Sequence, residues 1–225
     1  MSEEFDCFSE NYRTLLDKTV RLTGNNAEYF AELKARYLAR LLGRGFSGKV
    51  LDFGCGVGLL SKFLLAHLPK CTLHGYDPSS ACIEHVDRTV YSRGTFTWQD
   101  DRLDSAYDLI VVANVLHHVR VEDRSKTIVD LCARLAPGGY LATFEHNPAN
   151  PLTRWAVHAC PFDKNAVLLW PAEVKNLTRG CLHNVKLDYI TFFPRWAALF
   201  YSFEPFLAWC PIGAQYAVVG TKHRC

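Results

Sequence analysis

The sequence predicts an α/β fold: a doubly wound, mostly parallel seven-stranded sheet with helices on both faces and an antiparallel C-terminal edge strand. From residue 49 onward, short apolar runs alternate with amphipathic segments, which is typical of strand–helix–strand units. Tyr107–Ala113 is almost wholly apolar, as expected of a central strand covered on both faces. Residues 187–193 and 214–221 form two late strands, for which we expect an antiparallel hairpin at the sheet edge.

The expected elements follow in order from the N-terminus. Apolar residues recur at three- and four-residue steps over residues 9–42, which predicts two helices separated at Thr23–Asn26. We therefore expect an N-terminal helical cap over residues 1–45. The pattern then predicts strands at 50–53, 71–77, 95–98, 107–113 and 140–144, and helices at 59–68, 79–92, 121–136 and 172–179.

Residues 46–225 are expected to form the main domain, and two stretches of it depart from the strand–helix rhythm. Residues 146–172 are rich in proline and have no clean period, and residues 192–212 are rich in aromatic side chains. Long irregular stretches in compact domains usually serve binding or are disordered. We predict that both are insertions on the substrate side.

Composition excludes several classes of protein. With 49% hydrophobic and 21% charged residues, the 225-residue chain lies in the globular range, and its net charge is +2. The basic residues form no stripe, so no nucleic-acid partner is expected. The nine cysteines show no C-x-x-C spacing, which disfavours structural zinc. We expect a cytoplasmic protein without a signal peptide or a membrane span, since Glu204 and two prolines interrupt the apolar stretch Trp196–Ile212.

The strongest local signal is the glycine-rich turn after the first strand. Gly54 permits a tight turn, Gly56 lets backbone N–H groups approach a ligand, and Gly58 permits close packing of the next helix. Asp77 ends the second strand, where a carboxylate can accept hydrogen bonds from both hydroxyls of a ribose. The spacing differs from the dinucleotide fingerprint G-x-G-x-x-G, because Leu59 stands where that pattern has its third glycine.

Five motifs lie at or beside the predicted strands, in the same order along the chain as the strands. The motifs are Asp52-x-Gly54-x-Gly56-x-Gly58, Asp77-Pro78-Ser79, Tyr107-Asp108-Leu109-Ile110, Asn114-Val115-Leu116-His117-His118 and Leu135-Ala136-Pro137-Gly138-Gly139-Tyr140-Leu141. Together they resemble those of the class I S-adenosylmethionine-dependent methyltransferases. The resemblance covers about residues 46–220 and implies a Rossmann-like domain with S-adenosyl-L-methionine as cofactor.

The resemblance also implies which residues hold the cofactor. Residues 52–56 would wrap its methionine end, with Asp52 near the ammonium group, and Asp77 would bind the ribose. Either Asp100 or Asp101 would bind the adenine amino group, and the motif leaves this choice open. The implied cofactor-binding residues are Asp52, Phe53, Gly54, Cys55, Gly56, Asp77, Pro78, Asp100, Asp101, Asn114 and Val115.

Methyl transfer from a sulfonium requires alignment and exclusion of water, and a general base helps when the acceptor is a hydroxyl. His118 follows the predicted fourth strand and His146 follows the fifth, at the edge where ligands of parallel sheets bind. We predict His118 and His146 as candidate catalytic bases, with Glu145 as a third candidate. No metal site is predicted.

The acceptor is expected to be a small molecule methylated on oxygen, with nitrogen or carbon left open. Methyltransferases of base amines typically carry Asn-Pro-Pro-Tyr after the fourth strand, whereas this chain has Asn114–His117 there. Two alternatives stay open: a non-catalytic cofactor-binding module that regulates a partner, and an enzyme acting on a lipid-linked acceptor. The aromatic residues between 192 and 209 could line an acceptor pocket, form a dimer face or touch a lipid surface, so a monomer or a homodimer is expected.

Overall fold

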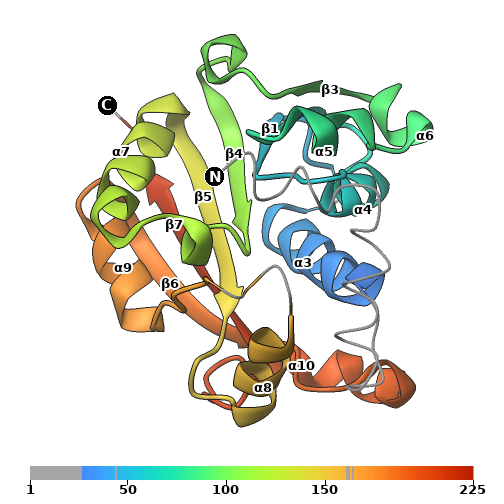
Figure 1. Ribbon diagram of the computed structural model, residues 1–225, viewed down its shortest axis with the longest axis vertical. Coiled ribbons are helices and arrows are strands. Elements are labelled where there is room, and N and C mark those ends of the chain that lie inside the picture. Colours follow the sequence, from blue (N-terminus) through green and yellow to red (C-terminus); the bar gives the residue numbers. More distant parts are fainter. Residues whose placement is uncertain (1–26, 44, 161–162, 164, 225) are drawn as a thin grey trace.

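The computed structural model describes residues 27–43, 45–160, 163 and 165–224 (Figure 1). Residues 1–26 of the expected N-terminal cap lie outside the described residues. The described part of that cap is one helix, α3 (Ala27–Leu42), which packs on α4 (Leu59–His67) and contributes to the same hydrophobic core.

Seven strands form a single sheet. They are β1 (Lys49–Phe53), β2 (Thr72–Tyr76), β3 (Gly94–Thr97), β4 (Tyr107–Ala113), β5 (Leu135–His146), β6 (Leu182–Ile190) and β7 (Gln215–Lys222). The sheet order is β3-β2-β1-β4-β5-β7-β6. Neighbouring strands within the set β1, β2, β3, β4 and β5 run parallel, whereas β7 is antiparallel to both β5 and β6. The predicted mostly parallel sheet with an antiparallel C-terminal strand is confirmed. That strand lies between β5 and β6, so β6 forms the edge.

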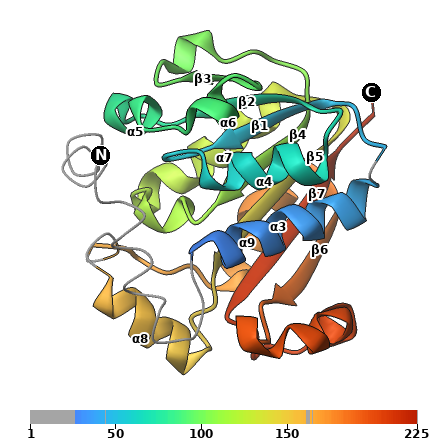
Figure 2. The ribbon, with the colours of Figure 1, turned by 90° about the vertical axis from the view of Figure 1, so that its right-hand side faces the viewer.

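Helices cover both faces of the sheet, as predicted (Figure 2). The remaining helices are α5 (Ser80–Glu84), α6 (Arg88–Tyr91), α7 (Arg124–Arg134), α8 (Pro151–Ala159), α9 (Pro171–Arg179) and α10 (Glu204–Leu207), with 3₁₀ turns at η2 (Asp100–Arg102), η3 (Leu116–His118), η4 (Val121–Asp123) and η6 (Arg195–Phe203). One apolar core lies under α3 and α4, and a second lies under α7 and α9. Because β4 is covered on both faces, its buried residues are apolar.

Three element boundaries differ most from the sequence expectation. The late strand expected over 187–193 runs instead from Leu182 to Ile190, where it pairs with β7. The helix predicted over 79–92 is split into α5 and α6, because the Asp87 side chain accepts a hydrogen bond from the Thr89 N–H at 2.8 Å and caps a new helix. The fifth strand begins at Leu135 rather than at 140, since Leu135 already pairs with Tyr107 across a bulge.

The two irregular stretches contain helical structure that the sequence pattern did not predict. Within 146–172, the Asn150 side chain accepts a hydrogen bond from the Thr153 N–H at 3.0 Å and starts α8, with Pro151 in the first turn. Within 192–212 lie η6 and α10. Figure 1 shows α8 and α10 beyond the ends at which β4 and β5 point.

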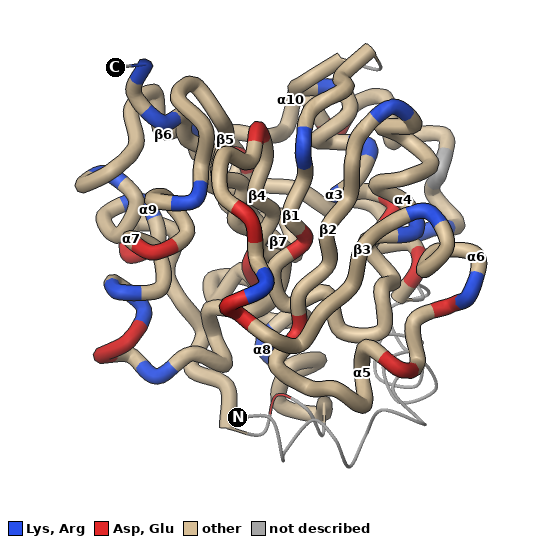
Figure 3. The backbone as a smooth tube through the Cα atoms, turned by 90° about the horizontal axis from the view of Figure 1, so that it is seen from above, with Lys and Arg blue, Asp and Glu red and all other residues tan. Residues whose placement is uncertain are grey.

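Charged residues of both signs are spread along the chain. In the view of Figure 3, Lys and Arg lie on several separate elements, with Asp and Glu between them. Among the described helices, none is long and apolar enough to cross a bilayer.

Candidate functional site

A cavity of about 570 Å³ lies at the carboxyl ends of the parallel strands. Residues that follow β1, β2, β4 and β5 line it, together with α3, α8 and the stretch 191–196. Strand order reverses between β1 and β4, and doubly wound sheets bind ligands at such a reversal. The volume is in the range of small-molecule and cofactor sites.

The predicted glycine-rich turn forms one wall of this cavity. Gly54, Gly56 and Gly58 have φ angles of 75°, 53° and 75°, which residues with a Cβ rarely adopt. A Cβ added to Gly54 would lie 2.4 Å from Cγ2 of Val115, so the turn packs directly on the segment after β4. Glycine is therefore required at position 54 both by the positive φ angle and by the close contact with Val115.

Asp77 fixes the turn from the end of β2. Its Oδ2 accepts a hydrogen bond from the Gly56 N–H at 2.8 Å, and its Oδ1 accepts one from the Ser79 N–H at 3.0 Å. Asp77 is buried and lines the cavity. The carboxylate predicted from the sequence is thus at the cavity and is also part of the structure that shapes it.

Two buried groups of opposite charge lie on the same wall. Asp52 accepts a hydrogen bond from Oγ of Ser61 at 2.7 Å, and burial raises the pKa of Asp52 to about 6. Lys34 of α3 is 4% exposed, and burial lowers its pKa to about 8, although Glu145 and Asp52 favour its charged form. Sequence reasoning missed Lys34, because a lysine on an amphipathic helix usually marks the solvent face.

Four further residues of the predicted cofactor set also line the cavity: Cys55, Pro78, Asn114 and Val115. The buried Oδ1 of Asn114 has no hydrogen-bond partner among the described residues. Phe53 lies outside the cavity lining and stacks on Tyr76, with ring centroids 5.1 Å apart.

Asp100 and Asp101 are not brought to the cavity. Both are exposed in η2, and Oδ2 of Asp100 lies 3.0 Å from Nη2 of Arg134. Their assignment to the adenine stays a prediction, as does the choice between them.

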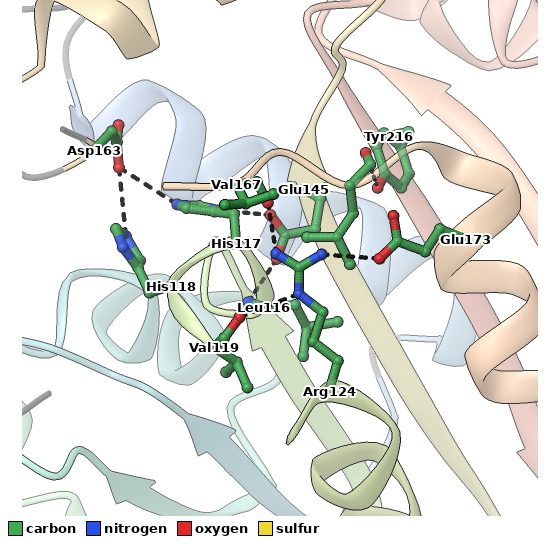
Figure 4. Close-up of polar contacts among 11 residues, drawn as sticks. Leu116, His117, His118, Val119, Arg124, Glu145, Asp163, Val167, Glu173 and Tyr216 are labelled. Carbon is green, nitrogen blue, oxygen red and sulfur yellow. Dashed lines mark hydrogen bonds and ion pairs between the residues drawn. The ribbon is translucent and has the colours of Figure 1, made fainter. Parts of the chain in front are cut away.

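A network of titratable side chains forms a second wall (Figure 4). Nδ1 of His117 lies 2.5 Å from Oε2 of Glu145, and Nε2 of His117 lies 3.4 Å from Oδ1 of Asp163. Nε2 of His118 lies at the same 3.4 Å from Oδ1 of Asp163. The other oxygen of Glu145, Oε1, accepts a hydrogen bond from the Leu116 N–H at 2.8 Å. Three segments far apart in sequence therefore meet here.

The histidines of this wall differ in charge. Burial disfavours protonation of His117, but Glu145 and Asp163 outweigh it and raise its pKa to about 9. Burial would raise the pKa of Glu145 and of Asp163, yet the histidines hold both below their usual range. Burial lowers the pKa of His146 to about 4, and its ring centroid lies 5.2 Å from that of His117. At neutral pH the wall thus holds one imidazolium beside one neutral imidazole.

The two predicted bases, His118 and His146, both line the cavity. Sequence reasoning assigned no role to His117 and missed Asp163. Asp163 lies in a stretch without a motif, and its contacts with His117 and His118 join residues more than 40 positions apart. No local signal could have found it.

Buried Arg124 holds the chain on the C-terminal side of Asp163 (Figure 4). Its Nη2 donates to the Val167 carbonyl oxygen at 2.7 Å, and its Nη1 lies 2.8 Å from Oε1 of Glu173. The Val167 N–H in turn donates to the carbonyl oxygen of His117 at 3.0 Å. These contacts hold Val167, four residues after Asp163, against the backbone of His117.

His117, His118 and Asp163 offer three potential metal-ligand atoms within 4.8 Å of one another. The contacts of both histidines with Asp163 account for the same arrangement without an ion. The expectation of no metal site stays a prediction.

Comparison with known proteins shows similarity over most of the chain. A family model described as a methyltransferase domain matches residues 26–186. The chain is 31% identical over 126 residues to a trans-aconitate 2-methyltransferase of Pseudomonas aeruginosa, covering 52% of the chain and 44% of the relative. It is 29% identical over 116 residues to a ubiquinone biosynthesis O-methyltransferase of Photorhabdus laumondii, covering 48% and 47%. The chain thus spans about half the length of the curated relatives it matches.

Solved structures share the fold. A SAM-dependent methyltransferase from Archaeoglobus fulgidus superposes with a TM-score of 0.69 at 14% identity, over 94% of the chain and all of that structure. The N-methyltransferase NodS of Bradyrhizobium japonicum, solved with S-adenosyl-L-homocysteine, superposes with a TM-score of 0.59 at 19% identity, over 84% of the chain and 85% of NodS. At these identities the similarity shows the fold alone.

Proposed function

The chain belongs to the class I S-adenosylmethionine-dependent methyltransferases, and we propose that it transfers a methyl group from S-adenosylmethionine to an oxygen atom of a small molecule. The observation that carries this proposal is that the glycine-rich turn and the histidine network line the same cavity. The donor and the group that removes a proton from the acceptor would therefore lie within one enclosure.

The residues of the first wall fit the cofactor. A Cβ at Gly54 would collide with Val115, and the buried Oδ1 of Asn114, which has no partner among the described residues, is an available acceptor in the same lining. Asp77 would bind the ribose, Asp52 the ammonium group and Lys34 the carboxylate of the methionine end. When bound, the cofactor supplies a methyl group already made electrophilic by a sulfonium.

The second wall would handle the proton of the acceptor. His117 is held protonated by two carboxylates, so it cannot accept a proton at neutral pH, whereas His146 is neutral and can. We assign the base to His146, with His118 as the second candidate. His117 would then stabilise negative charge that develops on the acceptor oxygen.

The proposal is tested by ligand binding and by methyl transfer. Calorimetry should detect S-adenosylhomocysteine binding to the wild type and lose it in Asp77→Ala, whereas Asp130→Ala, an exposed residue of α7, should bind normally. Labelled methyl transfer to phenols, carboxylic acids and amines then identifies the acceptor atom. Binding without transfer to any acceptor class would support the non-catalytic module instead, and no binding would refute the proposal.

The second candidate function is methylation of a lipid-linked acceptor, and an exposed aromatic face favours it. We define this face as Trp196, Leu199, Phe203, Phe206 and Trp209, of which four are at least 74% exposed. Trp196 also lines the cavity, so the face borders its mouth. Monomeric proteins rarely expose apolar patches of this kind, and tryptophan favours membrane interfaces.

Vesicle flotation distinguishes this candidate. Binding to phosphatidylcholine vesicles containing phosphatidylglycerol should require the aromatic face and fail in a Trp196→Ser/Phe206→Ser variant. Trp98→Ser removes a half-exposed tryptophan after β3 and should leave flotation unchanged. If the wild-type protein does not float with the vesicles, the aromatic face does not bind lipid. If the wild type elutes as a dimer in size-exclusion chromatography and the double variant elutes as a monomer, the face is a dimer contact instead.

A further inference from the structure

Two buried polar side chains of the cavity wall have no part in the function proposed so far. Thr191 is 6% exposed and Gln215 is 3% exposed, and both line the cavity. Neither Oγ1 of Thr191 nor Oε1 of Gln215 has a hydrogen-bond partner among the described residues. Buried polar atoms are nearly always paired, so two unpaired oxygens on one cavity wall require an explanation.

The sheet brings the two residues together beside the proposed base. Gln215 begins β7 and pairs with His146 of β5 on one side and with Ile190 of β6 on the other. Thr191 follows Ile190, and its carbonyl oxygen accepts a hydrogen bond from the Ala214 N–H at 3.0 Å. Side chains of directly paired residues share a face of the sheet, so Gln215 is the immediate neighbour of His146.

Thr191 is also held in a strained backbone conformation. Its φ angle is 65°, which is a genuine outlier for a β-branched residue. Such strain persists only where the surrounding structure enforces it, and it concentrates at ligand-binding sites. The strain is independent of the missing hydrogen bonds, and both observations concern the same residue.

The chemistry of the pair indicates what it would bind. A threonine hydroxyl can donate or accept a hydrogen bond, and a glutamine amide offers both functions. A hydroxyl group on a ligand also does both, so it suits hydrogen bonds to side chains of this kind. The surrounding wall contains Phe30, Phe192 and Phe193, which suit an apolar or aromatic body.

We infer that Thr191 and Gln215 form an acceptor subsite for a second hydroxyl next to the oxygen that is methylated. This inference rests on the proposed function, because the neighbouring position at His146 is where the reacting oxygen would lie. The acceptor is then a vicinal diol on an apolar or aromatic body. The base contacts one hydroxyl, and the Thr191–Gln215 pair contacts the other.

Catechol and phenol provide a matched pair of probes, since they differ only in the second hydroxyl. With S-adenosylhomocysteine bound, we expect catechol to bind the wild type roughly 10- to 100-fold more tightly than phenol, the range for a satisfied buried hydrogen-bond pair. Thr191→Val and Gln215→Leu should each abolish most of this preference and leave S-adenosylhomocysteine affinity unchanged. Equal or absent binding of the two probes to the wild type, or a preference that survives both substitutions, would overturn the subsite.

Thermal unfolding separates this role from a structural one. Thr191→Val and Gln215→Leu remove buried oxygens that have no hydrogen-bond partner among the described residues, so both variants should unfold at or above the wild-type temperature. Thr153→Val is the control, because its buried hydroxyl donates to the Ala214 carbonyl oxygen at 2.9 Å and its loss should lower the unfolding temperature. A comparable loss in the two test variants would show that they serve the fold. Failure of the wild type to bind S-adenosylhomocysteine would instead refute the proposed function.

Discussion

The two walls of the cavity are built in different ways. The wall of the glycine-rich turn comes mainly from two short segments that follow β1 and β2, with Lys34 of α3 and Val115 beside them. The histidine wall joins Glu145, His117 and Asp163, which lie in three separate segments. A wall made mainly from short local motifs can be identified from the sequence, whereas a wall made from long-range ion pairs exists only once the chain has folded.

The largest expected effect concerns the first wall. Gly54→Val would place a side chain within contact distance of Val115 at a φ angle of 75°, so the turn must move. We expect S-adenosylhomocysteine affinity to fall by at least about 100-fold, equivalent to about 3 kcal/mol. Gly180→Ala is the matched control, since a Cβ there meets nothing within 4 Å. Calorimetry measures both, and normal binding by Gly54→Val would show that the turn does not hold the cofactor.

Substitutions in the histidine wall should lower the rate of methyl transfer rather than the affinity for the cofactor. Glu145→Gln removes the carboxylate that pairs with His117 and leaves a buried imidazolium less compensated. Breaking a buried pair costs about 3 kcal/mol of unfolding free energy, and we expect methyl transfer to slow by roughly 100-fold. Urea denaturation and initial rates report the two effects. Exposed Glu122→Gln should change neither, and an equal loss of cofactor affinity in Glu145→Gln would mean that the walls are not separable.

Lys34 lies on α3 and links the two walls through its interactions with Asp52 and Glu145. If it binds the cofactor carboxylate, Lys34→Gln should weaken S-adenosylhomocysteine binding by roughly 10-fold, or about 1.4 kcal/mol. Because the pKa of Lys34 is about 8, wild-type affinity should decrease as the pH rises through that value. The variant should lack this pH dependence, and a parallel decline in both proteins would place the titrating group elsewhere.

The fourth expected effect is on the pH dependence of stability. The pKa of His117 is about 9 in the folded chain and near its ordinary 6.5 when unfolded. Its charge therefore stabilises the fold fully below pH 6.5, and this contribution is lost as the pH rises through 9. Urea denaturation across this range should show the decline in the wild type and a weaker one in His117→Gln. An identical decline in both proteins would assign it to other groups.

Sequence and structure agree most closely where a signal is local. The strand–helix alternation predicted the seven-stranded sheet, and the glycine spacing placed Gly54 and Asp77 at the cavity. The helix α8 was missed because its Asn150 cap and Pro151 lie in a proline-rich stretch without apolar periodicity. The terminal strand was predicted at an edge but inserts between β5 and β6, a choice that depends on pairing rather than on pattern.

By itself, the sequence determined the sheet, the position of the glycine-rich turn and the family, because these follow from short-range periodicity and from backbone conformations that only certain residues adopt. Tertiary structure alone decided which histidine is charged, which acids pair with it and which buried oxygens lack a partner among the described residues. Charge and hydrogen bonding depend on the distance between groups and on their burial, and neither is encoded at the position of a single residue.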